Sequence, residues 1–430
     1  MLVIRGGRVL DPSNGFDGTA DVVIEKGRVA RVGPDAGASL RGEGVESIDA
    51  SGFWVVPGLI DLHAHFREPG EEHKETLAHG LRAAAAGGFT TVCAMPNTHP
   101  VNDSASITKA MLAASGAADG ARLLPFGAIT RGSFGEQLTE MADQRDAGAV
   151  GVTDDGRCVM DAAVMRRAME YARTFDLLIS QHCEDHSLTA GAVMHEGPIS
   201  ARLGLRGWPR EAEDIIVARD LSLAEKTGAR YHVAHVSSFG AVRLLREAKS
   251  RGLKVSAEVT PHHLSLTDEA LLGYNTACKV NPPIRSAEDR AALREALSDG
   301  TIDCIATDHA PHTDFDKEGD LDGAAFGING LESAVALLLS LVREGLLSPM
   351  RMIEALSTSP ARILRDQERG SLQQGAVADI TLIDPISRWT LTAATMQSKS
   401  HNTPWLDHEL QGRVMATLVN GHVAYQANAS

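Results

Sequence analysis

The feature that most restricts the fold is a regular alternation along residues 57–365. Short apolar segments are separated by longer stretches with helical periodicity, such as AAVMRRAMEYARTF and AEDRAALREALSDG. Strands that alternate with helices pair in parallel, so the pattern predicts an α/β fold. We predict a (β/α)8 TIM barrel, with a doubly wound open sheet as the alternative. The expected strands are GLIDLHAHF, FTTVCAMP, RLLPFGAIT, AVGVT, LLISQHC, RYHVAHVS, KVSAEVTP and DCIATDHAP.

The two ends of the chain follow a different pattern. Residues 1–56 and 366–430 consist of short strand-like segments separated by turns. Asn420-Gly421 is a strong signal for a tight β-hairpin. We therefore predict that both ends join in one small composite β-sandwich domain, with the barrel formed by residues 57–365.

Charge and cysteine usage exclude several classes of protein. The formal net charge is −15, and such a surface repels nucleic acid and anionic membranes. The five cysteines are scattered without a C-x-x-C pair, which favours a reducing compartment. The first residues lack an apolar signal region, and no apolar run reaches the roughly 18 residues of a membrane span. We predict a cytoplasmic protein with neither nucleic-acid nor membrane partners.

Side chains of the types that bind metals lie at the carboxyl ends of the predicted strands, where TIM barrels have their active sites. His63 and His65 are two residues apart in a strand, so they point to the same side. Taken singly, each histidine is more often a structural residue, and an aspartate before glycine is more often part of a turn. Their convergence favours a centre for zinc, manganese or iron. The strand ends carry His63, His65, Asp154, Asp155, His182, His235, Asp308, His309 and His312.

Seven motifs in order resemble those of the bacterial class I dihydroorotases, a family of the amidohydrolase superfamily. They are DLHAHFREPG, AMPNT, TDDG, HCED, TPHHL, KVNPPIR and IATDHAPH, and the resemblance covers nearly the whole chain. It implies a zinc-dependent enzyme that reversibly cyclises N-carbamoyl-L-aspartate to L-dihydroorotate in de novo pyrimidine biosynthesis. It also implies two zinc ions, one held by His63, His65 and Asp308, a second by His182 and His235, with Asp155 bridging them. The residues alone do not distinguish Asp154 from Asp155 in that role.

One departure separates this chain from other members of the superfamily. Hydantoinases and dihydropyrimidinases bridge their metals with a carboxylated lysine on strand four. This chain has no lysine between Lys109 and Lys226, so that strand cannot supply one. An aspartate has to take the bridging role, which argues against the cyclic-imide relatives.

The resemblance also implies a reaction and its substrate contacts. Metal-bound hydroxide attacks a ring amide, and Asp308 transfers the proton to the leaving nitrogen. Dihydroorotate carries a carboxylate, and Arg67 lies two residues beyond His65, where a guanidinium can grip it in a bidentate manner. We expect the polar segment 313–327 to be a mobile loop whose Phe326–Gly327 end offers backbone groups to substrate. The implied substrate contacts are His65, Arg67, Asn97, Asn281, His312, Phe326 and Gly327.

Two alternative functions stay open. One is allantoinase or another amidohydrolase that acts on cyclic amides. The other is a non-catalytic homologue that serves as a partner of aspartate transcarbamoylase, although such a protein has little reason to keep all six ligands. The resemblance is compatible with a homodimer and with association of the active enzyme with aspartate transcarbamoylase.

Overall fold

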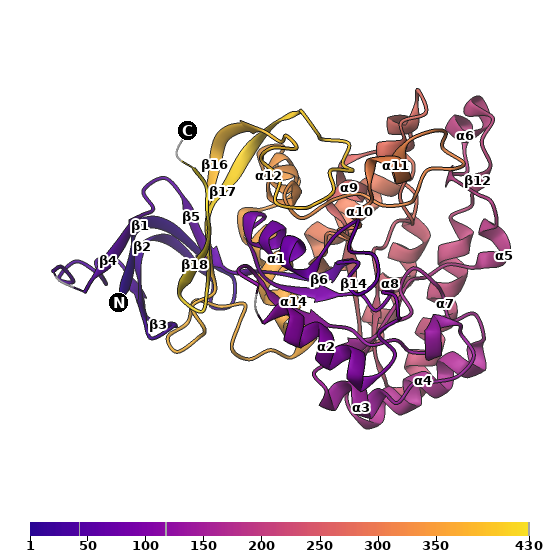
Figure 1. Cartoon of the computed structure of the whole chain (residues 1–430), viewed down its shortest axis with the longest axis horizontal. Coiled ribbons are helices and arrows are strands. Elements are labelled where there is room, and N and C mark those ends of the chain that lie inside the picture. The colour runs from indigo at the N-terminus through magenta and orange to yellow at the C-terminus, as the bar shows by residue number, and fades with distance from the viewer. Residues whose placement is uncertain (43, 117, 429–430) are drawn as a thin grey trace.

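The computed structural model describes residues 1–42, 44–116 and 118–428. Figure 1 shows a β-rich region, which contains both ends of the chain, beside a larger region of strands and helices. Among the described residues, none of the helices combines the length and the apolar character that crossing a membrane requires.

Strands from both ends of the chain form one mixed sheet in the order β18-β17-β16-β5-β1-β2-β3, with β4 paired to β1. The two ends meet where β16 pairs antiparallel with β5. The expected hairpin joins β17 to β18, and Asn420 (φ 52°) and Gly421 (φ 77°) have the positive φ angles that such a tight turn requires. These strands are β1 (Leu2–Asp11), β2 (Phe16–Glu25), β3 (Arg28–Gly33), β4 (Glu46–Asp49), β5 (Trp54–Pro57), β16 (Ile380–Thr390), β17 (Glu409–Val419) and β18 (His422–Gln426).

The larger region contains two parallel sheets, β6-β7-β8 and β9-β10-β13-β14-β15. Isolated parallel bridges link Gly127 to Val152 and Ala64 to His309, so the two sheets adjoin at both of their edges. Each of the eight predicted strand segments contains one observed strand. The strands are β6 (Leu59–Ala64), β7 (Phe89–Ala94), β8 (Arg122–Pro125), β9 (Gly151–Val152), β10 (Leu178–Gln181), β13 (Arg230–Val233), β14 (Val255–Val259) and β15 (Cys304–Ile305); a separate pair is β11 (Met194–His195) with β12 (Gly207–Trp208).

Helices connect these strands and begin where the sequence supplies caps. The Thr76 side chain accepts a hydrogen bond at the start of α1, and Ser286 with Asp289 forms a capping box on α10. The helices are α1 (Leu77–Ala86), α2 (Ala105–Ser115), α3 (Met141–Asp146), α4 (Ala162–Thr174), α5 (His186–Thr189), α6 (Pro198–Leu203), α7 (Glu211–Thr227), α8 (Phe239–Ser250), α9 (Pro261–Ser265), α10 (Ala287–Asp299), α11 (Asp314–Lys317), α12 (Ala334–Arg343), α13 (Pro349–Ile353) and α14 (Ser359–Leu364).

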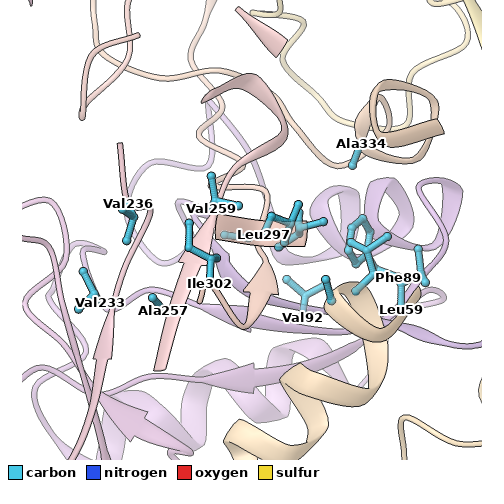
Figure 2. Packing of buried hydrophobic residues seen from close by; sticks show 14 of the residues in the cluster. Leu59, Phe89, Val92, Val233, Val236, Ala257, Val259, Leu297, Ile302 and Ala334 are labelled. Carbon is cyan, nitrogen blue, oxygen red and sulfur yellow. The ribbon is translucent and has the colours of Figure 1, made fainter. Parts of the chain in front are cut away.

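The main hydrophobic core lies between the parallel strands and these helices. Phe89 and Val92 of β7, Val259 of β14 and Leu297 of α10 are almost completely buried there (Figure 2). Burying a side chain of this size contributes roughly 1.5–3 kcal/mol. Because the strands are parallel, their carboxyl ends lie on the same side of the sheets. The core holds the strands in place and so positions the residues that follow each strand.

Candidate active site

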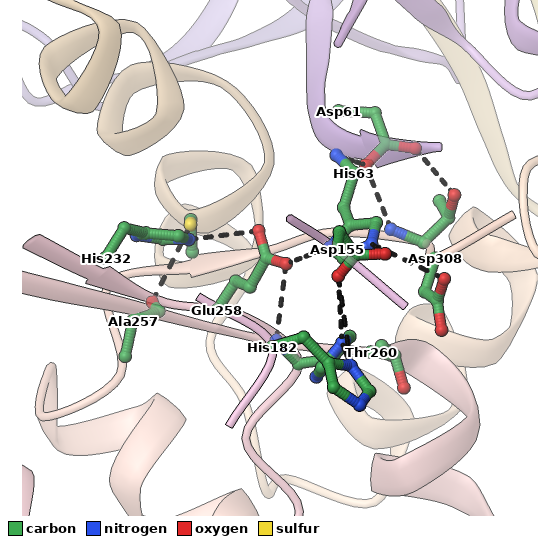
Figure 3. A network of polar contacts seen from close by, with 12 residues as sticks. Asp61, His63, Asp155, His182, His232, Ala257, Glu258, Thr260 and Asp308 are labelled. Atoms are coloured by element: carbon green, nitrogen blue, oxygen red, sulfur yellow. Dashed lines mark hydrogen bonds and ion pairs between the residues drawn. The ribbon is translucent and has the colours of Figure 1, made fainter. Parts of the chain in front are cut away.

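The first predicted ligand set comes together where β6 and β15 end. His63 belongs to β6, whereas His65 lies one residue beyond it and is fixed by a backbone hydrogen bond to His309 O (2.8 Å). The Asp308 Oδ1 atom lies 3.1 Å from His65 Nε2 and 3.6 Å from His63 Nε2 (Figure 3). All three side chains are buried.

Asp155 lies between this set and the second predicted pair. Its Oδ2 atom is 3.2 Å from His63 Nε2 and 3.4 Å from His65 Nε2. Its Oδ1 atom is 3.4 Å from His235 Nε2 and 3.9 Å from His182 Nδ1. The two carboxylate oxygens therefore face different histidine pairs, as a bridging ligand requires.

Asp154 faces away from the histidines. Its Oδ1 atom accepts hydrogen bonds from the backbone amides of Ile129 (2.8 Å) and Thr130 (3.0 Å). Burial raises the pKa of Asp154 to about 6, with hydrogen bonds from Thr130 and Ile129 opposing that rise. The structure thus distinguishes two adjacent aspartates that the sequence left equivalent.

The chemistry of this cluster fits divalent cations. The ligand atoms of His63, Asp155 and His235 lie within 4.8 Å of one another, as do those of His63, His65 and Asp308. His63 Nε2 and Asp155 Oδ1 are buried without a hydrogen-bond partner, which costs about 1–3 kcal/mol per group. A cation on each side of Asp155 would satisfy both atoms, and nitrogen with carboxylate oxygen is a donor set that zinc accepts.

Both central carboxylates are ionised near neutral pH. Burial opposes the charge on Asp155, but His63 and His235 hold its pKa well below the usual range. Burial likewise opposes the charge on Asp308, and the hydrogen bond with His65 together with the neighbouring His63 lowers its pKa. Ionised carboxylates are the form that binds a metal or accepts a proton.

Glu258, which sequence reasoning missed, supports the ligands from behind. Its Oε1 atom lies 2.7 Å from His63 Nδ1, and its Oε2 atom lies 3.1 Å from His232 Nε2 (Figure 3). Burial would raise the pKa of Glu258, but His63 and His232 lower it to about 2. A carboxylate that accepts from His63 Nδ1 leaves Nε2 directed at the metal position. The available signal was a single glutamate inside the apolar strand segment KVSAEVTP.

Glu184 plays a comparable part for the second pair, and it was also missed as a site residue. Its Oε2 atom lies 2.8 Å from His182 Nε2 and accepts from Asn281 Nδ2 at 3.1 Å. Asp61, two residues before His63, accepts from Thr307 N (2.9 Å) and so fastens β6 to the segment after β15. These acidic residues position the ligands and do not themselves line the cavity described next.

A cavity of about 250 Å³ opens beside the ligands. Every substrate contact implied by the resemblance lies on its wall: His65, Arg67, Asn97, Asn281, His312, Phe326 and Gly327. Asn97 also orients a predicted ligand, because its Oδ1 atom lies 2.9 Å from His65 Nδ1.

Arg67 and His312 form a second polar group on the cavity wall, which we call the cation end to distinguish it from the metal end that the ligands form. Arg67 is buried, its Nε donates to Pro311 O (3.1 Å), and its Nη2 lies 3.1 Å from His312 Nε2. Burial and the neighbouring Arg67 lower the pKa of His312 to about 3, so its imidazole is neutral. A buried guanidinium held by neutral groups is suited to a ligand carboxylate.

The segment 313–327 has regular structure at its start. It contains α11 and begins with a capping box between Thr313 and Asp316. At the Phe326–Gly327 end, where we expect backbone groups to face substrate, the Gly327 amide donates to Lys279 O at 3.0 Å. Phe326 and Gly327 still line the cavity, with Phe326 O placed 2.9 Å from His312 Nε2.

Comparisons with known proteins show the family to which the chain belongs. A family model described as "Dihydro-orotase-like" matches residues 52–240. The chain is 53% identical over 428 residues to a dihydroorotase of Anaeromyxobacter dehalogenans strain 2CP-1, covering 99% of this chain and 98% of that protein. It is 52% identical over 426 residues to a dihydroorotase of Pelotomaculum thermopropionicum, with coverage of 99% and 98%.

Among solved structures, an L-hydantoinase (dihydropyrimidinase) from Arthrobacter aurescens superimposes with a TM-score of 0.88 at 25% identity, covering 98% of this chain and 95% of that one. The α/β fold and the buried histidine–aspartate cluster are thus those of an amidohydrolase. The sequence identity to dihydroorotases over the full length of the chain is more specific than the structural likeness to a hydantoinase. It shows that the chain belongs to the dihydroorotase family.

Proposed function

We propose that this chain is a dihydroorotase that interconverts N-carbamoyl-L-aspartate and L-dihydroorotate. The observation that carries the proposal is one cavity whose wall carries both a cluster of metal-ligand side chains and the buried Arg67. Dihydroorotate offers a ring amide to the first and a carboxylate to the second. Allantoin has no carboxylate, so an allantoinase would leave Arg67 without a ligand group.

The metal end holds two zinc ions in this proposal. His63, His65 and Asp308 hold one ion, His182 and His235 hold the other, and Asp155 bridges them, as the distances to its two oxygens support. When bound, such ions polarise a carbonyl and lower the pKa of water to near 7.

Asp308 is the proton carrier. In ring opening, its ionised carboxylate takes the proton that the attacking water loses and passes it to the ring nitrogen. In ring closure, the same carboxylate removes the proton from the attacking carbamoyl nitrogen. Its ionised state near neutral pH and its position on the cavity wall both support this role.

The other residues bind and orient the substrate. Arg67 donates to the substrate carboxylate, and its Nε donates to Pro311 O, which holds the guanidinium in place beside the neutral His312. The Asn281 Oδ1 atom is buried without a hydrogen-bond partner and is available to a ring N–H. Phe326 and Gly327 close the remaining wall.

The finer architecture belongs to the same proposal. The two bridges between the parallel sheets support a closed (β/α)8 barrel over residues 57–365. The pairing of β5 with β16 supports a composite β-sandwich domain built from residues 1–56 and 366–430. The resemblance to the family is the basis for expecting a cytoplasmic homodimer that is able to associate with aspartate transcarbamoylase.

Turnover of the zinc-supplemented protein tests the function. We expect ring opening of L-dihydroorotate and ring closure of N-carbamoyl-L-aspartate, with no turnover of allantoin. Turnover of allantoin alone would identify an allantoinase. If the metal-loaded protein turns over none of the three compounds, the proposal is refuted and the non-catalytic partner is favoured. Turnover would then be measured with an aspartate transcarbamoylase added.

A further inference from the structure

Two buried lysines hold the segment 313–327, which we call the cavity loop, and the proposed chemistry uses neither: Lys317 belongs to the loop, whereas Lys279 lies outside it. Lys279 is 2% exposed and Lys317 is 8% exposed. The Lys279 ammonium donates to the backbone carbonyls of Leu321 (2.5 Å) and Asp322 (3.1 Å). A buried ammonium is costly to desolvate, and here backbone carbonyls of the loop itself replace the lost water.

Lys317 fastens the start of the loop to its end. Its ammonium donates to Ala325 O (2.8 Å) and Gly327 O (3.1 Å), and also to Lys279 O (3.1 Å). These three bonds use all the N–H donors that a lysine has. The cavity loop is therefore closed on itself and bound to the backbone of Lys279.

Lys279 also holds the part of the loop that faces the cavity. Its ammonium lies 4.3 Å from the centre of the Phe326 ring, within the range of a cation–π contact. Its carbonyl accepts the hydrogen bond from the Gly327 amide. Phe326 and Gly327 are cavity-wall residues, whereas Lys279 is not on the wall.

We propose that Lys279 is a positioning residue that holds Phe326 and Gly327 in place and so sets the affinity for substrate. The identity of that substrate rests on the proposed function; the restraint on the loop does not. An apolar side chain of the same length would fill the space without the cost of desolvating a charge. The ammonium is needed only to gather the loop carbonyls and the Phe326 ring.

A spin label and steady-state kinetics together test this role. The described cysteines are all buried, so a nitroxide on Glu318→Cys, at an exposed loop position, reports loop motion without substrate. In that background, Lys279→Met should give a more mobile nitroxide than the parent. With L-dihydroorotate we expect KM to rise tenfold or more and kcat to fall less than threefold, because Asp308 and the metal ligands are untouched. Lys254→Met, at an exposed lysine on the loop before β14, is the matched control and should change neither quantity.

The nitroxide spectrum tests the restraint on the cavity loop, and KM tests its effect on substrate affinity. A folded Lys279→Met protein whose nitroxide spectrum and KM match the parent overturns the proposal, as does a mobile nitroxide with an unchanged KM. A large fall in kcat at constant KM would assign Lys279 to the chemistry instead and also overturns it. If Lys279→Met does not fold, Lys279→Gln is judged by the same criteria. A parent without dihydroorotate turnover refutes the proposed function, while the nitroxide still decides the restraint.

Discussion

The two ends of the cavity are built in different ways. At the metal end, His63 and His182 each contact a buried carboxylate, Glu258 and Glu184 respectively, at less than 3 Å. At the other end, Arg67 is held by the carbonyl of Pro311 and by a neutral histidine. Side chains fixed by charged partners suit groups that must keep a metal geometry, whereas a cation held by neutral groups keeps its charge for a ligand.

The two groups of residues also differ in the sign of the charge that they supply to the cavity. On the cavity wall, Asp155 and Asp308 supply negative charge to the metal end, and Arg67 supplies positive charge to the cation end. A substrate with a reactive amide at one side and a carboxylate at the other can bind in one orientation only. Variants that affect one end and spare the other therefore test this comparison.

The largest effect is expected from Asp308→Asn at the metal end. Loss of the proton carrier should lower kcat by about 10³–10⁴-fold, in the range of general acid–base catalysis. Single-turnover and steady-state rates of ring opening measure it, with metal content determined on the same sample. Near-parental turnover in a metal-loaded variant would exclude Asp308 as the carrier.

The matching change at the cation end is Arg67→Met, which removes the guanidinium and keeps an apolar stem. We expect KM for L-dihydroorotate to rise about 100-fold with kcat changed only a few-fold, because the lost contact is present in ground and transition states alike. Circular dichroism serves as the folding control for this buried position. An unchanged KM would remove Arg67 from the site.

A smaller effect is expected when the support of a ligand is altered. Glu258→Gln keeps the size of the side chain but weakens the hold on His63, and the metal affinity should fall about 10–100-fold. Titration of the chelator-treated protein with zinc measures this, with the exposed Glu247→Gln as control. Parental zinc affinity in Glu258→Gln would show that Glu258 only fills space.

The smallest effect concerns His312 and stability in acid. Its pKa is about 3 in the folded chain and about 6.5 when unfolded, so the unfolded chain binds the proton more tightly. Stability is therefore lost as the pH falls below 6.5 toward 3, by roughly 2–3 kcal/mol between pH 7 and pH 4. His312→Gln should lose less stability over that interval, as urea unfolding of the chelator-treated proteins would reveal. Equal losses in parent and variant would contradict a neutral, buried His312.

The sequence predicted most of the metal end because strand alternation places the ligands. His63 and Asp308 follow apolar strand segments, so their convergence follows from the order of strands and helices alone. Asp154 and Asp155 could not be separated in this way, because a turn of the backbone decides which carboxylate faces the histidines. Glu258 escaped notice because a single acidic residue within a strand has no spacing pattern.

The cavity loop shows a second limit of the sequence. Its polar, acidic composition predicts a mobile segment but does not reveal its anchors, which are contacts from Lys279 and Lys317 to backbone carbonyls. Such contacts depend on where the chain folds back and leave no periodic signal in the sequence. The hairpin at Asn420-Gly421, by contrast, follows from local turn chemistry and was predicted correctly.

The most direct test of the two-ended cavity compares L-dihydroorotate with dihydrouracil, which has the same ring without the carboxylate. With the zinc-supplemented protein, we predict that kcat/KM for L-dihydroorotate exceeds that for dihydrouracil by about 10³-fold or more, since a site built for a polar group rejects the analogue that lacks it. Equal values, or a preference for dihydrouracil, would mean that the metal end acts without the cation end and would contradict the account.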